Sequence, residues 1–171
     1  MGKLKRRALG GSGLFLGIDP GMGGALGLIE QGRVLRVLDM PVLRAEGKKG
    51  RAIVNIPVLI DLLTMLRGEF PHTIAALENV RSMPRDGHVG AFSFGRCFGT
   101  IETALYATGY PVLLYSPHVW KKGMGLTSDK DRARALASRL FPKDAASSWP
   151  LKKHDGRAEA VLLAYWAANN N

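Results

Sequence analysis

The chain has 171 residues, of which 46% are hydrophobic, and its 24 Lys and Arg exceed its 14 Asp and Glu to give a formal net charge of +10. This length fits one domain with an apolar core and leaves little room for a second, and the composition excludes an intrinsically disordered chain. So large a positive surplus favours a polyanionic partner, with a merely soluble basic protein as the alternative. No apolar run approaches the roughly 20 residues of a membrane-spanning helix, so we expect no membrane association.

The single cysteine and the N-terminal segment bear on compartment and domain organisation. Cys97 is the one cysteine of the sequence, which excludes an intramolecular disulfide and favours a reducing compartment. No Cys–His motif surrounds it, so we interpret it as a small buried hydrophobe rather than a nucleophile. Residues 1–13 are basic and glycine-rich without the apolar stretch of a secretory signal. We predict a flexible arm there, which either contacts phosphates or is a solvated tail, followed by a single domain over residues 14–171.

The first part of that domain has the pattern of a strand meander. Residues 14–19 form a short apolar run that ends in an acid, which is typical of a buried strand. Residues 25–30 and 33–39 flank a two-residue Gln-Gly turn and predict an antiparallel hairpin. Residues 41–55 are polar and basic, and we interpret them as a surface loop.

Helical and strand patterns alternate in the middle of the chain. Pro57 stands where a helix can begin, and apolar residues at helical spacing follow it to about Gly68. Residues 73–78 are a second apolar run that ends in an acid. A helix is predicted from about Val89 to Thr108, where Gly109 stops it. Residues 110–116 are another buried strand.

The last third is predicted to be mostly helical. We interpret residues 120–130 as a basic connector and residues 145–153 as a loop, with helices over 131–140 and 155–168. Hairpin strands first and crossovers later indicate a mixed sheet with helices on its faces.

Four acids of the chain form a candidate metal site. Asp19 and Glu78 end two predicted buried strands, where a charge is costly unless it is paired or metal-bound. Asp155 and Glu159 are four residues apart and therefore share one face of the last helix near its N-terminus. As an alternative, Asp155 is an N-cap-like acid and Glu159 a solvated one.

Four converging carboxylates would suit Mg²⁺, with Mn²⁺ as a substitute, because hard cations prefer oxygen ligands. Two such ions about 3.5–4 Å apart can stabilise both the attacking and the leaving oxygen in phosphodiester hydrolysis, and Asp19 is placed to be their common ligand. His154 adjoins Asp155. It would orient a water, ligate a metal or contact a phosphate, or else be a plain surface histidine.

Four segments of the chain resemble RuvC-type Holliday-junction resolvases, in the same order and at similar spacing. They run from about residue 14 to residue 168, and the DGRAEA of the last is closest to the phage and plastid branch of that family. The segments are GIDPGMGGALGL (17–28), ALENV (76–80), SPHVWKKGMGLTSDKDRA (116–133) and KKHDGRAEAVLLAYW (152–166).

The resemblance implies an α/β, RNase H-like fold whose five-stranded mixed sheet is flanked by helices. It implies a homodimeric, Mg²⁺-dependent endonuclease that resolves four-way DNA junctions by paired symmetric nicks through two metal ions. Such an enzyme would work in the cytoplasm or nucleoid of a bacterial or phage-infected cell, or in an organelle.

Site residues carry over position by position. The metal-binding acids would be Asp19, Glu78, Asp155 and Glu159, and Lys130 would stabilise charge at the scissile phosphate. Phe92 or Phe94 would wedge between bases, although Phe94 and Phe98 also fit a core role. Gly95 and Gly99 fit either a dimer interface or ordinary helix packing. The expected DNA contacts are Lys121, Lys122, Arg81, Arg85, Lys152 and Lys153.

Other classes fit the sequence less well. DPGMGG also resembles a phosphate loop of sugar or acetate kinases, but such proteins need two related halves, for which this chain is too short. A junction-binding module without catalysis has no support, since all four acids are present. Another RNase H-like enzyme, an exonuclease or an RNA–DNA hybrid nuclease, is the nearest rival.

Overall fold

A five-stranded mixed sheet forms the centre of the molecule. The computed structural model describes residues 13–44, 52–80, 87–127 and 130–171, with the Lys130 side chain outside the described part. The strand order is β3-β2-β1-β6-β7, with β1–β2 and β2–β3 antiparallel and β1–β6 and β6–β7 parallel. All five strands expected from the sequence are confirmed: β1 (Leu14–Asp19), β2 (Ala25–Glu30), β3 (Arg33–Asp39), β6 (Ile74–Glu78) and β7 (Val112–Tyr115).

The β2–β3 hairpin is closed by the Gln-Gly turn that the sequence indicated. Gln31 has φ 47° and Gly32 has φ 73°, so both central residues adopt the left-handed conformation of a tight hairpin turn. Beyond a register shift between Leu28 and Ile29, Ala25 at the start of β2 pairs with Asp39 of β3, and on its other side with Asp19 of β1.

The expectation of a loop over residues 41–55 was wrong in part. Strands β4 (Val42–Arg44) and β5 (Ala52–Val54) form a separate two-stranded antiparallel sheet, and residues 45–51 lie outside the described part. Val54 is buried in the same core cluster as Met40, so apolar residues at the two ends of the segment order it. The basic residues between them, Lys48, Lys49 and Arg51, had suggested a surface loop.

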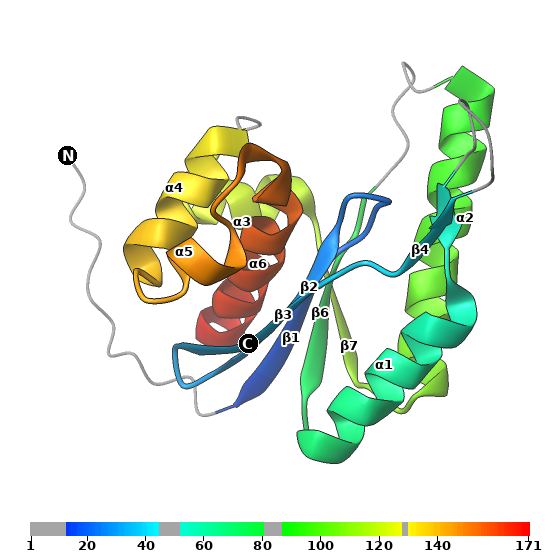
Figure 1. The fold of residues 1–171 in the computed structure, drawn as a ribbon, viewed down its shortest axis with the longest axis horizontal. Helices are drawn as coiled ribbons and strands as arrows, with labels where there is room; N and C mark the ends of the chain where they lie inside the picture. The colour runs from blue at the N-terminus through cyan, green and yellow to red at the C-terminus, as the bar shows by residue number, and fades with distance from the viewer. Residues whose placement is uncertain (1–12, 45–51, 81–86, 128–129) are drawn as a thin grey trace.

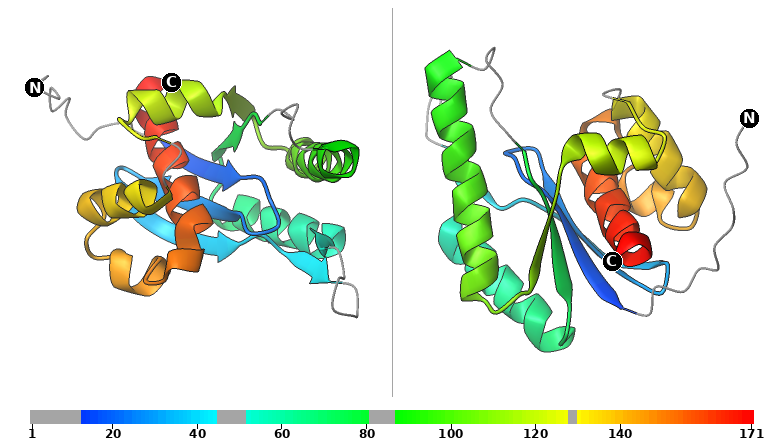
Figure 2. Two further views of the ribbon diagram at one scale, coloured as in Figure 1. Left: turned by 90° about the horizontal axis from the view of Figure 1, so that it is seen from above. Right: turned by 180° about the vertical axis from the view of Figure 1, so that it is seen from behind.

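Helices cover both faces of the sheet (Figures 1 and 2). On one face lie α1 (Ile56–Glu69), which begins at the N-cap Asn55, and α2 (Gly87–Ala107). The other face carries α3 (Pro117–Gly123), α4 (Lys130–Leu140), α5 (Ala145–Ser148) and α6 (Asp155–Asn170).

Two of the segments expected to be irregular are therefore partly helical. The connector over 120–130 begins inside α3, because Pro117 starts a helix directly after β7. The loop over 145–153 contains α5 and the 3₁₀ turn η1 (Lys152–His154). Within the described residues, no helix combines the length and the apolar character needed to cross a membrane.

Side-chain alternation along β1 and β6 decides which face the acids occupy. Leu16 and Ile18 of β1 lie in the core under α1 and α2, whereas Phe15 lies in the core under α6. Since successive side chains of a strand point to opposite faces, Asp19 shares the face of Phe15. On β6, Ala76 belongs to the α6-side core, and Glu78 follows it by two residues.

Helix α6 lies unusually close to the centre of the sheet. A Cβ at Gly17 of β1 would lie 2.6 Å from the backbone nitrogen of Ala164 and closer still to the Ala160 carbonyl oxygen. A Cβ at Gly27 of β2 would lie 2.8 Å from Val161 Cγ2. The two glycines thus remove the side chains that would hold the helix away, and this close packing carries Glu159 of α6 to the end of β1.

Candidate active site

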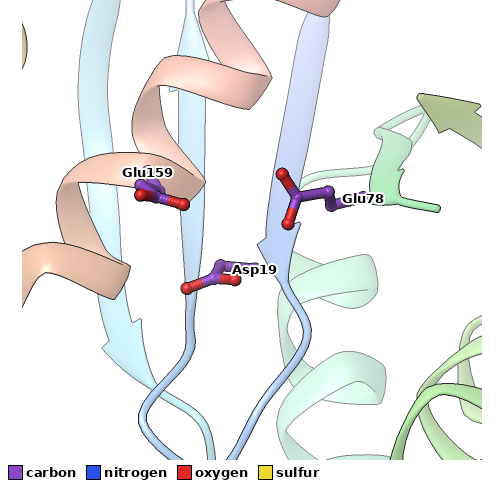
Figure 3. Close-up of side chains that lie close together, drawn as sticks. All are labelled: Asp19, Glu78 and Glu159. Atoms are coloured by element: carbon purple, nitrogen blue, oxygen red, sulfur yellow. The ribbon is translucent and has the colours of Figure 1, made fainter. Parts of the chain in front are cut away.

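Three carboxylates meet at the carboxyl end of the parallel strands (Figure 3). Asp19 is the last residue of β1, Glu78 is the last residue of β6, and Glu159 lies in the second turn of α6. One carboxylate oxygen from each lies within 4.8 Å of those from the other two. Since β1 and β6 are parallel neighbours, their ends coincide at this edge, and α6 lies over it.

Adjacent residues of α3 donate hydrogen bonds to these acids. The indole N–H of Trp120 donates to Glu78 Oε1 at 2.9 Å. Lys121 Nζ lies 2.7 Å from Glu159 Oε2 and 3.4 Å from Glu78 Oε1. The Glu78 and Glu159 side chains are only 7% and 13% exposed, so the acids and their partners form a largely enclosed polar cluster.

Burial and neighbouring charges shift the pKa values of Glu78 and Lys121 in opposite directions. Burial raises the pKa of the Glu78 carboxyl, and the Lys121 ammonium and the Trp120 indole counteract it in part. Burial acts to lower the pKa of Lys121, but Glu159, Glu78 and Asp19 outweigh it and raise that pKa above its usual value. Lys121 therefore stays a cation, and it balances part of the negative charge of the cluster.

The donor set fits a divalent metal ion. All three acids offer only oxygen ligands, which Mg²⁺ and Mn²⁺ prefer. The Lys121 ammonium already lies between two of the carboxylates, those of Glu78 and Glu159. A cluster that already attracts one cation has the charge and the spacing to hold another. Asp19, Glu78 and Glu159 are the residues that could hold it.

Asp155, the fourth acid of the sequence prediction, does not belong to the group of three. It lies one turn before Glu159 in the first turn of α6 and is half-buried, which puts about 6 Å of helix between them. His154 is also outside the group, and its Nδ1 accepts a hydrogen bond of 3.3 Å from the Leu151 backbone N–H. Metal ligation by these two residues remains a prediction.

Two further residues of the DGRAEA segment position α6. A Cβ at Gly156 would lie 2.9 Å from Asp19 Oδ2, so only a glycine lets this turn approach the carboxylate so closely. Arg157 donates two hydrogen bonds of 2.6 Å to the two carboxylate oxygens of Asp39 and one of 3.0 Å to the Ser148 carbonyl. The hydrogen bond from Arg157 also lowers the pKa of Asp39. Neither role was predicted from the sequence, although Gly156 and Arg157 stand between the two candidate acids Asp155 and Glu159.

A groove of about 620 Å³ lies beside the acid cluster, lined by Pro117, His118, Lys121, Lys122, Gly125, Leu126 and Thr127. Lys122 is exposed at its rim, whereas Lys121, which was expected to contact the DNA backbone, points into the acids. Lys152 and Lys153 are exposed on η1. The predicted DNA contacts Arg81 and Arg85 and the side chain of Lys130 lie outside the described residues.

Helix α2 presents both core and exposed residues. Cys97 is only 4% exposed, and burial, with a smaller effect of the Asp19 charge, raises its pKa to about 11. Its predicted role as a small buried hydrophobe is confirmed. Phe92 is 72% exposed, whereas Phe98 packs against the core. A Cβ at Gly95 or Gly99 would meet nothing within 4 Å in the described part of the chain, so packing within it does not explain these glycines.

No family model matches the chain, but individual proteins do. It is 34% identical over 90 residues to the chloroplastic Holliday junction resolvase MOC1 of Chlamydomonas reinhardtii, a match that covers 50% of this chain and 10% of that protein. The structure of T. thermophilus RuvC in complex with a Holliday junction substrate matches with a TM-score of 0.59 at 18% identity, over 92% of this chain and 96% of that one. The yeast mitochondrial Holliday junction resolvase Ydc2 matches with a TM-score of 0.51 at 17% identity, over 92% and 78%.

These similarities establish the fold. The mixed sheet with flanking helices is the RNase H-like fold of RuvC, and the resemblance to RuvC-type resolvases found in the sequence is confirmed. The matched region spans about a tenth of the length of the curated relative.

Proposed function

We propose that the chain is an endonuclease that resolves four-way DNA junctions with the help of divalent metal ions. The observation that carries this proposal is the convergence of Asp19, Glu78 and Glu159 at one edge of a RuvC-like sheet. The names of the similar proteins support a four-way junction as the substrate. MOC1 and Ydc2 are described as Holliday junction resolvases, and the RuvC structure contains a Holliday junction substrate.

The three carboxylates would hold Mg²⁺, or Mn²⁺ in its place. A divalent cation bound there supplies electrostatic stabilisation for the hydrolysis of a phosphodiester, giving a 5′-phosphate and a 3′-hydroxyl. Asp155 and His154 are candidates for further ligands because they lie one turn away on the same helix or directly before it. In a two-ion arrangement, they would add ligands to the group of three.

Lys121 would change partners when the site is loaded. Its ammonium is paired with Glu159 at 2.7 Å and Glu78 at 3.4 Å, and a divalent cation would compete for the same two carboxylates. Displaced from them, Lys121 stays beside the groove that it lines with Lys122. There it would contact a DNA phosphate, and Lys130 at the start of α4 would stabilise developing charge at the scissile phosphate.

The charge distribution supports DNA as the partner. The chain carries a net charge of +10, and Lys122, Lys152 and Lys153 are exposed close in sequence to the acids or their partners. Phosphate contacts of this kind supply most of the sequence-independent affinity and make it fall steeply with salt. Arg81 and Arg85, in the segment before α2, are proposed as further contacts.

A homodimer would supply two active sites for paired symmetric nicks. Helix α2 is a candidate for the dimer contact because Gly95 and Gly99 have open space beside them, and Phe92 is exposed near its N-terminal end as the candidate wedge between bases. The chloroplastic relative makes an organelle a possible location beside the bacterial or phage-infected cell.

Cleavage of defined substrates tests the proposal. Purified protein is incubated with a synthetic four-way junction, a duplex of the same sequence and an RNA–DNA hybrid, in Mg²⁺ and in EDTA. We expect paired nicks in the junction in Mg²⁺ alone, and none from the Asp19→Asn variant. Equal cutting of the plain duplex would contradict junction resolution, and preferential cutting of the hybrid would favour the rival RNase H-like nuclease.

A further inference from the structure

We propose that Trp120 is a positioning residue, whose indole N–H holds the Glu78 carboxylate in the orientation that binds metal. The inference rests on the proposed function, because it concerns the same site. Trp120 donates to Glu78 Oε1 at 2.9 Å, and both side chains are buried, Trp120 with 1% and Glu78 with 5% of their surface exposed. None of the sequence motifs pointed to this pair.

The hydrogen bond is more than a by-product of packing. Trp120 belongs to the α6-side core with Phe15 and Val161, and apolar packing alone does not require an N–H there. A buried indole N–H needs an acceptor, and here the acceptor is a carboxylate, which makes the bond charge-assisted and shorter and stronger than a neutral one. The choice of tryptophan is therefore explained by the acid that it contacts.

The two oxygens of Glu78 acquire different roles from this contact. Oε1 accepts from Trp120 and also faces Lys121 Nζ at 3.4 Å. With Oε1 held by the indole, Oε2 is the oxygen that can turn toward Asp19 and a shared cation. Fixing a ligating carboxylate through a hydrogen bond to its other oxygen sets its orientation before the metal arrives.

Trp120 and Lys121 differ in how easily they can move. Lys121 ends in a flexible four-carbon chain that is 23% exposed, so its ammonium can leave when a divalent cation competes for the carboxylates. The Trp120 ring is enclosed in the core and cannot. Helix α3 thus supplies one permanent donor and one displaceable donor to the same Glu78 oxygen.

The backbone explains how Trp120 reaches Glu78. Glu78 pairs with Tyr115 at the ends of β6 and β7, and α3 begins two residues after Tyr115. The Trp120 backbone N–H donates to the Ser116 carbonyl at 3.2 Å, so the first turn of α3 brings the indole back over the strand ends. The short connection between β7 and α3 therefore determines where the Trp120 indole lies.

A matched pair of tryptophan variants tests this role. Trp120→Phe keeps a ring and removes the N–H, and Trp149→Phe does the same at a second buried indole, which donates to Ser138 Oγ at 3.0 Å away from the acids. Mn²⁺ binding to the DNA-free protein is measured from the electron paramagnetic resonance signal of free Mn²⁺. We expect Trp120→Phe to weaken Mn²⁺ binding by roughly 10–100-fold and Trp149→Phe to leave it unchanged. Wild-type affinity in a folded Trp120→Phe protein would overturn the proposal.

The wild-type protein provides a second measurement that does not depend on the variants folding. Its three tryptophans give three indole N–H signals in a ¹H–¹⁵N NMR spectrum. We expect Mg²⁺ to shift the Trp120 signal and to leave that of Trp149 in place, and an unmoved Trp120 signal at saturating Mg²⁺ would contradict the proposal.

Asp19→Asn separates this inference from the function on which it rests. If Asp19→Asn binds Mn²⁺ as tightly as wild type, the metal site itself is wrong. If Asp19→Asn abolishes binding but Trp120→Phe does not weaken it, the metal site stands and the role of Trp120 is refuted.

Discussion

Replacing Gly17 by alanine is the sharpest test of how the fold positions the site. The added Cβ would lie 2.6 Å from the Ala164 backbone nitrogen and still closer to the Ala160 carbonyl oxygen. Both are backbone atoms, which cannot rotate away as a side chain would. Helix α6 must therefore retreat from β1 by roughly 1 Å to restore ordinary contact distances.

The cost of that retreat can be estimated. Overpacking a core costs about 1–3 kcal/mol and occasionally more, and a clash with backbone on the central strand belongs at the upper end, about 3 kcal/mol. For a protein of this size, each kcal/mol lowers the melting temperature by about 2–4 °C, so we expect a fall of roughly 6–12 °C. Glu159 moves with α6, and a misplacement of about 1 Å at a reacting site can cost on the order of 100-fold in rate.

Thermal unfolding followed by circular dichroism and the rate of junction cleavage are the two assays for Gly17→Ala. The control is Gly68→Ala in α1, where an added Cβ meets nothing within 4 Å and alanine favours the helix. Gly68→Ala should keep the wild-type melting temperature or raise it slightly. A Gly17→Ala protein with wild-type melting temperature and cleavage rate would refute the close packing of α6 on β1 as the basis of the site.

Four further predictions concern the charges. Because burial raises the pKa of Glu78, its charge is disfavoured in the folded protein, so Glu78→Gln should raise the melting temperature of the metal-free protein while abolishing Mn²⁺ binding. For the same reason, the Mn²⁺ affinity of the wild type should begin to fall at a pH above 4.5, the usual pKa of a glutamate carboxyl, because Glu78 takes up its proton at a higher pH than usual; an affinity that stays flat down to pH 4.5 would count against it. Lys121→Met removes the competing cation and should tighten Mn²⁺ binding in the absence of DNA yet slow cleavage, and weaker binding would speak against competition. Arg157 lowers the pKa of Asp39, so the stabilisation from this pair is present above pH 3.8 and is lost as pH falls through the lowered value. Because Asp39 is 63% exposed, Asp39→Asn should lower the free energy of unfolding, measured in urea, by at most about 1 kcal/mol at pH 7. Below the lowered pKa of Asp39, the variant and the wild type should have the same free energy of unfolding.

The parts of the site that depend on local pattern were predictable from the sequence. Asp19 and Glu78 each close a short apolar run, and an acid at the end of a buried strand is conspicuous because burying it is costly. Glu159 followed from its helical spacing to Asp155. The same spacing could not decide that Glu159 joins the group and Asp155 does not, because this depends on how far along the sheet α6 is placed.

The parts that depend on contacts between distant segments were not predictable. Arg157 and Asp39 are 118 residues apart and Trp120 and Glu78 are 42 apart, and no periodicity in a single sequence pairs such residues. The β4–β5 pair was not predicted for another reason. Its two strands have only three residues each, and the basic residues between them dominate the composition of residues 41–55. The sequence shows that residue 156 is a glycine, but the reason for it is the closeness of Asp19 Oδ2, which only the fold reveals.

The central claim is that Asp19, Glu78 and Glu159 form a metal centre from which Lys121 is displaced. A crystal of the full chain soaked in Mn²⁺ and measured near the manganese absorption edge tests it most directly. The account predicts an anomalous difference peak in contact with all three carboxylates and a Lys121 Nζ that has moved away from its 2.7 Å contact with Glu159 Oε2. No peak among these acids, with Lys121 still paired to Glu159 at saturating Mn²⁺, would contradict it.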